Sequence, residues 1–483
     1  MSGCRYLRYR PSGVEWLGCV PEHWQVRRAR FLLEVNPRGG RLREVSPGSE
    51  VSFVPMNAVG EYGGLRLETT RPAFEADGYT PFQDGDVLVA RITPSFENGK
   101  GALARELANG AAFGTTELHV LRAGPLLDPG YLFHLTLSHA FRQPGAGHMR
   151  GAGGQRRVPA DFCRDFPTPL PPMDEQRAIA AFLDARVAAL DRMIARHLAL
   201  HARLGELRDS LVSRTVTGRL ARDEASADEE QARTGTDELG EVPAHWAVER
   251  LRFSLRGIEQ GWSPLCDRIP AGEGEWGVLK VGAVNGPEFD PRENKALPAG
   301  DAPREQYEIR RGDLLVSRAN TLGLLGSAAL VGRVRPRLLL CDKLYRLHLR
   351  EERLLPAMLL HVLRSRLARV QMERQATGTS SSMQNISQAA IRNLRIAVPP
   401  LDEQRAIAAC LTCRTRRIDQ AREKIEIVIE RLKEYRTALI TAAVTGQIDV
   451  RGESSQAADE SGLDHDAMQW SAGIHSMAEA VTA

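Results

Sequence analysis

The sequence predicts an α+β fold in which two mixed α/β modules are each followed by a long helix, the two helices pairing as an antiparallel coiled coil. One observation is a repeated phrase, Pro-Pro-x-Asp-Glu-Gln-Arg-Ala-Ile-Ala-Ala, which occurs at 171–181 and again at 399–409. Each copy opens a run of about 30 residues without Gly or Pro, as a long helix requires. The chain ahead of each copy holds short apolar runs separated by Gly, Pro, Asn and Asp, which is typical of strands and turns.

Length and composition indicate an ordinary multidomain protein. At 483 residues the chain is long enough for at least two cores, and no apolar stretch is long enough to span a bilayer. The N-terminus lacks the apolar segment of a secretory signal, and seven scattered cysteines fit a reducing compartment. We therefore expect a cytoplasmic protein with no membrane partner. The net charge of +3 conceals two acidic segments, 223–237 and 451–483, each with six acidic residues against one basic residue. The remainder is basic, which suits a polyanionic partner or an ordinary Arg-rich surface.

The first module is predicted at 1–170 and the second at 238–398. Both open on a Leu-Gly-x-Val-Pro-x-His-Trp phrase, whose Trp residues, Trp24 and Trp246, are 222 residues apart. The repeat unit therefore covers the modules as well as the helices. Strands are predicted at 51–56, 86–92 and 118–121 in the first copy, and at 277–281, 313–317 and 344–349 in the second.

One strand ends on an arginine in both modules. The segment 85–91, Gly-Asp-Val-Leu-Val-Ala-Arg, aligns with 312–318, Gly-Asp-Leu-Leu-Val-Ser-Arg. A Gly-Asp turn before an apolar strand is a common structural device, but it does not explain Arg91 and Arg318. Beyond these arginines the copies diverge. A shared framework with different loops is what two recognition modules for different targets would need, although ordinary drift of surface loops would look the same.

A polar stretch rich in Gly or Ser precedes each long helix, at 151–157 and at 377–385. Backbone N–H groups, hydroxyls, amides and arginines are groups that contact phosphates. The alternative is a plain linker into the helix.

The long helices are predicted at 171–222 and 399–450, with Asp174 and Asp402 as N-caps. Apolar side chains recur every seven residues in the second helix, at Ile418, Ile425, Leu432 and Leu439. This heptad seam predicts that the two helices pair as an antiparallel coiled coil. A helix of about 40 residues is about 60 Å long, so the pair could act as a ruler between the modules. The segment 223–237 is predicted to be an acidic linker, and 451–483 an acidic disordered tail.

Several kinds of catalytic site are missing from the sequence. It has no Pro-Pro-aromatic loop of an amine methyltransferase, no phosphate-binding Walker loop and no carboxylate cluster of a metal nuclease. The pairs His197–His201 and Cys410–Cys413 each lack the further ligands of a metal site. These absences favour a binding protein without metal or cofactor over an enzyme.

The arrangement resembles the specificity subunit of Type I restriction–modification systems. The resemblance is carried by the repeated helix starts, the Thr-Gly helix ends at 217–218 and 445–446, the Gly-Asp strands and the His-Trp openings, and it covers roughly residues 14 to 450. It implies two target-recognition domains that read a bipartite, asymmetric DNA sequence, with the helices as spacers. It also implies two methyltransferase subunits that bring S-adenosylmethionine, and restriction subunits that use ATP and Mg²⁺.

The predicted DNA contacts fall into three groups by chemistry. Arg91, Arg318 and Asn320 are expected at base edges, because Arg suits guanine and Asn suits adenine. Base or backbone contacts are expected from Thr93, Thr321, Lys100 and Lys343. Phosphate contacts are expected from Arg156, Arg157, Ser381, Ser382, Gln384 and Asn385. The alternatives are a nuclease or methyltransferase that acts alone, and a non-catalytic scaffold or orphan regulator that keeps the duplicated fold.

Overall fold

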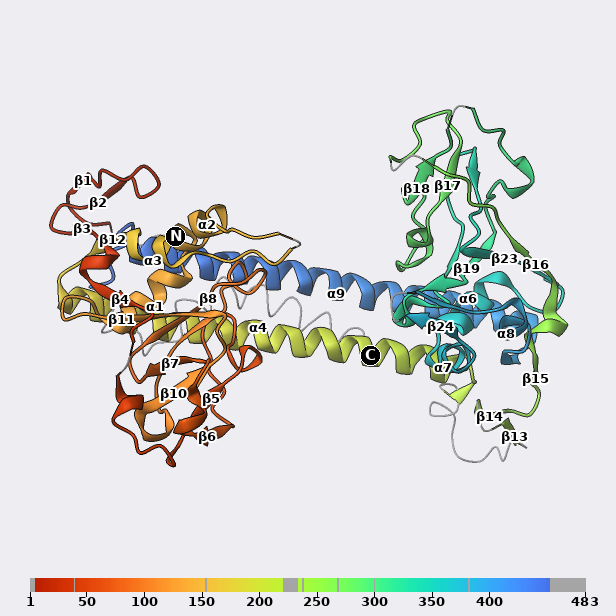
Figure 1. Cartoon of the computed structure of the whole chain (residues 1–483). Helices are drawn as coiled ribbons and strands as arrows, with labels where there is room; N and C mark the ends of the chain where they lie inside the picture. The colour runs from red at the N-terminus through yellow and green to blue at the C-terminus, as the bar shows by residue number, and fades with distance from the viewer. Residues whose placement is uncertain are drawn as a thin grey trace. The chain divides into compact units, whose positions relative to one another are not determined.

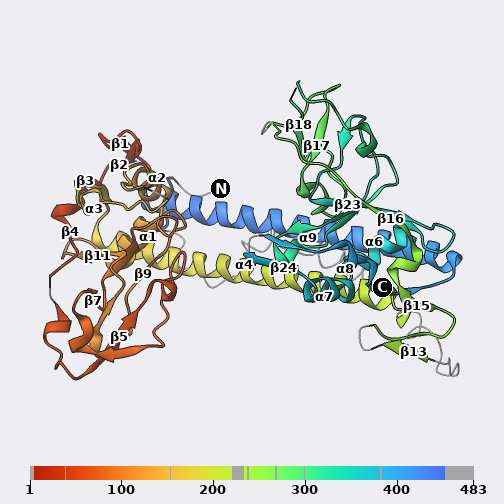
Figure 2. The same ribbon diagram turned by 45° about the vertical axis from the view of Figure 1, so that its right-hand side comes forward.

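The computed structural model describes residues 5–38, 40–152, 154–219, 233–236, 239–266, 269–298, 300–380 and 383–451. The chain divides into two compact units, each built from two separate stretches. Unit 1 contains the first module, the start of helix α4 (Met173–Thr215) and the end of helix α9 (Leu401–Val444). Unit 2 contains the second module, the end of α4 and the start of α9. In each unit the two helices run side by side (Figures 1 and 2). In the part of the chain that the structure describes, no helix is long and apolar enough to cross a membrane.

Unit 1 has two four-stranded sheets, with strand orders β6-β5-β10-β7 and β4-β11-β8-β9, and two strand pairs, β1-β2 and β12-β3. The strands are β1 Tyr9–Pro11, β2 Cys19–Pro21, β3 Gln25–Arg28, β4 Leu33–Val35, β5 Glu50–Val54, β6 Thr70–Pro72, β7 Thr80–Gln83, β8 Val87–Ala90, β9 Gly101–Leu103, β10 Ala111–Gly114, β11 Leu118–Ala123 and β12 Pro167–Leu170. Its short helices are α1 Pro129–Leu137, α2 His139–Gly147 and α3 Ala160–Asp165.

Unit 2 repeats this plan. Its sheets have the orders β16-β23-β19-β21, β18-β17-β22 and β20-β25-β24, with the pairs β13-β14 and β15-β26. The strands are β13 Arg233–Thr236, β14 Gly240–Pro243, β15 Ala247–Arg250, β16 Leu255–Gln260, β17 Gly277–Leu279, β18 Asn294–Ala296, β19 Leu314–Ser317, β20 Ala319–Asn320, β21 Ala328–Leu330, β22 Leu338–Leu339, β23 Leu344–Leu349, β24 Thr377–Ser380, β25 Met383–Asn385 and β26 Arg395–Val398. Its short helices are α6 Pro356–Arg364, α7 Arg366–Arg374 and α8 Gln388–Arg392.

The six predicted strands are confirmed, with ends that differ by up to two residues. Strand β13 lies inside the segment 223–237 that the composition predicts to be a linker, and it pairs with β14. Apart from this strand and Arg451, the predicted linker and the predicted tail lie outside the described residues.

The repeated helix start anchors each module through its Glu and Gln. Glu175 accepts hydrogen bonds from Trp24 Nε1 at 2.9 Å and pairs with His23 Nε2 at 2.8 Å. Glu403 does the same with Trp246 and His245, at 2.9 Å each.

A second set of bonds joins the next residue, Gln176 or Gln404, to backbone groups of the module and of the Pro pair. These contacts explain why the His-Trp phrase and the helix start recur together.

The predicted N-caps are wrong by two positions. The backbone N–H of Gln176 donates to the carbonyl of Pro172 at 2.9 Å, so Pro172 accepts the first helical hydrogen bond and takes the N-cap position. Pro400 has the same role before Gln404, also at 2.9 Å. The aspartates lie in the first turn instead, where a negative charge still interacts favourably with the helix dipole.

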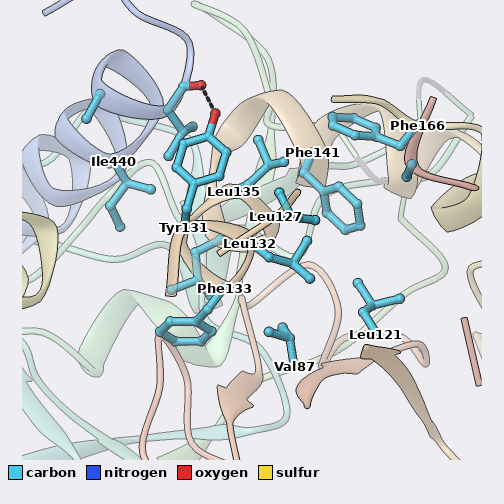
Figure 3. Close-up of a cluster of buried hydrophobic side chains, with 14 of the residues drawn as sticks. Val87, Leu121, Leu127, Tyr131, Leu132, Phe133, Leu135, Phe141, Phe166 and Ile440 are labelled. Carbon is cyan, nitrogen blue, oxygen red and sulfur yellow. Dashed lines mark hydrogen bonds between the residues drawn. The ribbon is translucent and has the colours of Figure 1, made fainter. Parts of the chain in front are cut away.

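Each core takes side chains from both long helices. In unit 1 the core combines Trp24, Tyr131 and Leu183 with Ile440 and Val444. The hydroxyl of Tyr131 lies 3.0 Å from the carbonyl oxygen of Val444, a contact drawn in Figure 3. In unit 2 the core joins Val212 and Val216, near the end of α4, to Leu411 at the start of α9.

The helices end on glycines that contact the opening of the other module. Gly218 and Gly446 both have φ of 73°, which strongly favours glycine. A Cβ at Gly446 would lie 2.4 Å from Pro21, and a Cβ at Gly218 would lie 2.6 Å from Pro243. The end of each helix therefore packs closely against the Val-Pro-x-His-Trp phrase of the other repeat.

Candidate nucleic-acid interface

The Gly-Asp turn in each module fixes the strand that leads to the predicted site. In unit 1 the buried carboxylate of Asp86 accepts two hydrogen bonds from Arg122, both 2.7 Å, and a third from the backbone of Gln83. In unit 2 Asp313 accepts a bond from Arg346 Nη1 at 2.9 Å and another from the backbone of Arg310. The structural role predicted for this turn is confirmed, and the ion pair explains why its second residue is Asp.

The two polar stretches are parts of β ladders rather than plain linkers. The backbone N–H of Val158 donates to the carbonyl of Arg91, and that of Ile386 donates to the carbonyl of Arg318, both at 2.8 Å. In unit 2 this contact lies directly beside the sheet formed by β20, β25 and β24. In unit 1 it continues as bridges from Arg157 to Ile92 and to Arg150. The chain after each strand-ending Arg therefore lies beside the polar stretch.

In unit 2 the ladder brings several predicted residues together. Asn320 lies opposite Gln384, and Ala319 lies opposite Asn385. The amide of Asn320 donates to Asn285 Oδ1 at 3.0 Å and, more weakly, to the carbonyl of Leu324 at 3.3 Å.

Thr321 is exposed at the end of this strand, and its backbone N–H donates to the side chain of Asn320. These neighbours form one polar surface. Ser381 and Ser382 lie outside the described residues.

Arg318 and Lys343 are neighbours at the edge of the same surface. The backbone N–H of Arg318 donates to the carbonyl of Lys343 at 2.9 Å, and the side chain of Lys343 is exposed. The Nη1 atom of Arg318 lies 3.3 Å from the carbonyl oxygen of Asp342, and its guanidinium is 6.0 Å from the ring centre of Tyr345.

In unit 1 the predicted arginines are engaged by carboxylates. Arg91 and Arg157 converge on Glu117, whereas Arg156 pairs with Glu97 at 3.5 Å. The hydroxyl of Thr93 donates to the carbonyl of Arg156 at 3.1 Å. These residues therefore lie together.

Lys100 lies near this group through its backbone. Its carbonyl accepts a hydrogen bond from the N–H of Ala90, the residue before Arg91, at 3.1 Å.

In each module, a side chain at an equivalent position on β11 or β23 also contacts a backbone carbonyl just after the polar stretch. His119 Nε2 lies 2.8 Å from the carbonyl oxygen of Val158, and Tyr345 Oη donates to the carbonyl of Ile386 at 3.3 Å. Burial lowers the pKa of His119, which keeps this imidazole neutral at pH 7. The two residues occupy equivalent positions on β11 and β23, opposite Val89 and Val316. The same framework therefore carries different side chains in the two modules.

Comparison with known proteins finds relatives of one kind. A model described as "Type I restriction modification DNA specificity domain" matches residues 302–431. The Type I restriction enzyme EcoEI specificity subunit of Escherichia coli is 28% identical over 496 residues, covering 88% of this chain and 83% of the relative. The chain is therefore similar to Type I restriction enzyme specificity subunits over most of its length.

Two other comparisons point the same way. The EcoAI specificity subunit of Escherichia coli is 36% identical over 163 residues, which are 33% of this chain and 27% of that relative. A chain from a solved structure described as "Structural basis underlying complex assembly and conformational transition of the type I R-M system" has a TM-score of 0.63 at 22% identity. The match covers 88% of this chain and 98% of that chain, so the two chains share a fold over most of this sequence.

The structure adds residues to the candidate interface that the sequence patterns missed. Glu117 stands directly before β11 and contacts two predicted arginines, and Asn285 contacts Asn320. The position of Glu117 could have been found by aligning the modules, because Leu118 and Leu344 begin equivalent strands. Asn285 has no such signal, since it lies 35 residues from its partner in a loop.

Proposed function

We propose that this protein is the DNA sequence-recognition subunit of a Type I restriction–modification complex. Each module would read one half of a bipartite, asymmetric target. The observation that carries the proposal is a matched pair of backbone hydrogen bonds, which join Arg91 to Val158 in the first module and Arg318 to Ile386 in the second. Beyond the shared backbone the exposed groups differ, as two modules for different half-sites require.

The residue types on the two surfaces suit duplex DNA. Guanidinium groups form bidentate pairs with guanine, and the amides of Asn320 and Gln384 can form the equivalent pair with adenine. Lys343 and Arg156 are exposed cations that can contact phosphates, and such contacts supply most of the sequence-independent affinity. The half-site assigned to the second module would depend on Arg318, Asn320 and Thr321.

The chemistry of methylation and cleavage is assigned to partner subunits. We propose that two methyltransferase subunits with S-adenosylmethionine, and restriction subunits with ATP and Mg²⁺, assemble on this chain. Their site of action would be the cytoplasm, where the cellular DNA lies. The long helices α4 and α9 would fix the number of base pairs between the half-sites. In this assignment the chain itself is not an enzyme.

Long-read mapping of methylated bases tests the proposal. DNA from cells that contain the neighbouring methyltransferase gene would be compared with and without the gene for this chain. A bipartite motif with a fixed gap, present only with this gene, is expected. If no motif appears, a pull-down of the methyltransferase subunit separates two outcomes. Copurification would indicate a silent system, and its absence would favour a scaffold or orphan regulator. Turnover by the purified chain alone would contradict the non-catalytic role.

A further inference from the structure

The two modules carry opposite charges at one equivalent position. The carbonyl of Glu117 accepts a hydrogen bond from the backbone of Arg91, and the carbonyl of Lys343 accepts one from the backbone of Arg318, both at 2.9 Å. Each of these residues stands immediately before its strand, β11 or β23. The backbones therefore match, but the side chain is an acid in unit 1 and a base in unit 2.

Glu117 holds two arginines of the first module. Arg157 donates to it as a fork, with Nε 2.9 Å from Oε2 and Nη2 2.7 Å from Oε1. Arg91 Nε approaches Oε2 at 3.4 Å. The carboxylate is partly buried, with 23% of its side chain exposed, against 33% for Arg91 and 40% for Arg157. The hydrogen bond from Arg157 lowers the pKa of Glu117, so the carboxylate stays charged at neutral pH.

The arginine of the second module has a different environment. Within the described part of the chain, Arg318 and Lys343 have no carboxylate within ion-pair distance. Among the described residues, Arg318 is oriented by the carbonyl of Asp342 and by the ring of Tyr345, and its buried Nε atom has no hydrogen-bond partner. A guanidinium held by a carboxylate fork has a fixed plane, whereas one held by a single long bond can rotate.

A guanidinium has five N–H donors, and Glu117 engages two of them on Arg157 and one on Arg91. The remaining donors keep directions set by the ion pair, and base recognition in the major groove depends on such directions. We propose that Glu117 is a positioning residue that sets the base preference of the first module by orienting Arg91 and Arg157. The second module has Lys343 at the same place, so its Arg318 is not oriented by a carboxylate there. This inference rests on the proposed function.

The experiment is methylation mapping of the assembled complex with Glu117→Gln, which removes the charge and keeps the shape. We expect the first half-site to change, with discrimination at one or two base pairs falling roughly 5- to 150-fold, as for the loss of one bidentate base contact. The second half-site and the gap should stay as in the wild type. Glu117→Asp should recover part of the preference. The matched control is Glu97→Gln, which breaks the neighbouring pair with Arg156 and should leave the motif unchanged.

The possible results separate this inference from the function on which it rests. An unchanged motif with Glu117→Gln overturns the inference, and so does uniformly weaker methylation with the same motif, which indicates a structural role. A wild-type chain that directs no bipartite methylation overturns the proposed function and the inference with it. If Glu117→Gln fails to fold, Arg157→Lys tests the same point, because an ammonium keeps the charge but cannot form the fork. A changed first half-site in that variant supports the inference, and an unchanged one overturns it.

Discussion

Arg208 on α4 donates from Nε to Asp419 Oδ1 on α9 at 2.9 Å, and this ion pair has a counterpart in the other unit. Asp191 on α4 pairs with Arg436 on α9, and these positions are the repeat equivalents of Asp419 and Arg208. The two pairs sit among the apolar contacts of the helices, with 16% and 20% of the side chains of Arg208 and Asp419 exposed. A charged pair inside a helical seam favours one register over its neighbours.

Arg208→Ala should therefore destabilise unit 2 by roughly 1–3 kcal/mol, since it leaves a partly buried carboxylate without its partner. Equilibrium urea unfolding measures the change. The control is Arg405→Ala, which breaks an exposed pair with Asp402 on the same helix and should cost less than about 0.5 kcal/mol. Equal losses for the two variants would contradict a special role of the inter-helix pair.

The anchors at the two helix starts should differ in strength. Glu175 has 5% of its side chain exposed, while Glu403 has 42%. Glu175→Ala leaves the buried indole N–H of Trp24 without its acceptor. This change should destabilise unit 1 by roughly 1–3 kcal/mol. Glu403→Ala should destabilise unit 2 less, because water can reach Trp246 more easily. Thermal unfolding of the two variants tests this order, and a larger effect at Glu403 would refute it.

Acid should destabilise unit 2 through His361. Burial against α9 lowers the pKa of His361 to about 4, and its Nε2 atom lies 3.1 Å from the hydroxyl of Thr412. Between pH 6.5 and 4 the unfolded chain binds a proton on this residue and the folded chain does not, so stability falls as the pH falls. The loss should reach roughly 3 kcal/mol near pH 4. His361→Gln should remove this part of the pH dependence, which urea unfolding at several pH values will measure. Parallel pH curves for the two proteins would show that His361 does not contribute.

Arg318→Ala should relax or abolish recognition of one half-site only. A bidentate base contact contributes roughly 1–3 kcal/mol of discrimination, so the preferred base at that position should lose roughly 5- to 150-fold. Lys343→Ala should instead weaken binding to all sequences about equally and reduce the salt dependence of binding. Competition binding at two salt concentrations separates these effects. Uniform weakening by Arg318→Ala would contradict its assignment to a base edge.

The repeat in the sequence predicted most of the framework, because aligned copies identify strands and helices that either copy alone shows weakly. It could not predict the partners of Glu175 or Glu117, since those contacts join residues about 150 and 26–40 positions apart. Asp174 was the expected N-cap from residue preference alone, but the carbonyl of Pro172 takes that position. The stretch at 377–385 has the composition of a linker, yet β20 gives it a neighbour with which to pair. Tertiary context decided each of these cases.

The Tyr131–Val444 contact has a consequence for the order of synthesis. Unit 1 needs Leu439, Ile440 and Val444 to complete its core, and these residues are made about 250 positions after Leu190, the last residue that α4 contributes to that core. At roughly 5–20 residues per second, the first module waits roughly 10 to 50 s on the ribosome with part of its core open to water. In unit 2 the order is reversed, because the end of α4, which contributes Val212 and Val216 to its core, is synthesised before the second module. The N-terminal half of this protein is therefore the last to finish folding.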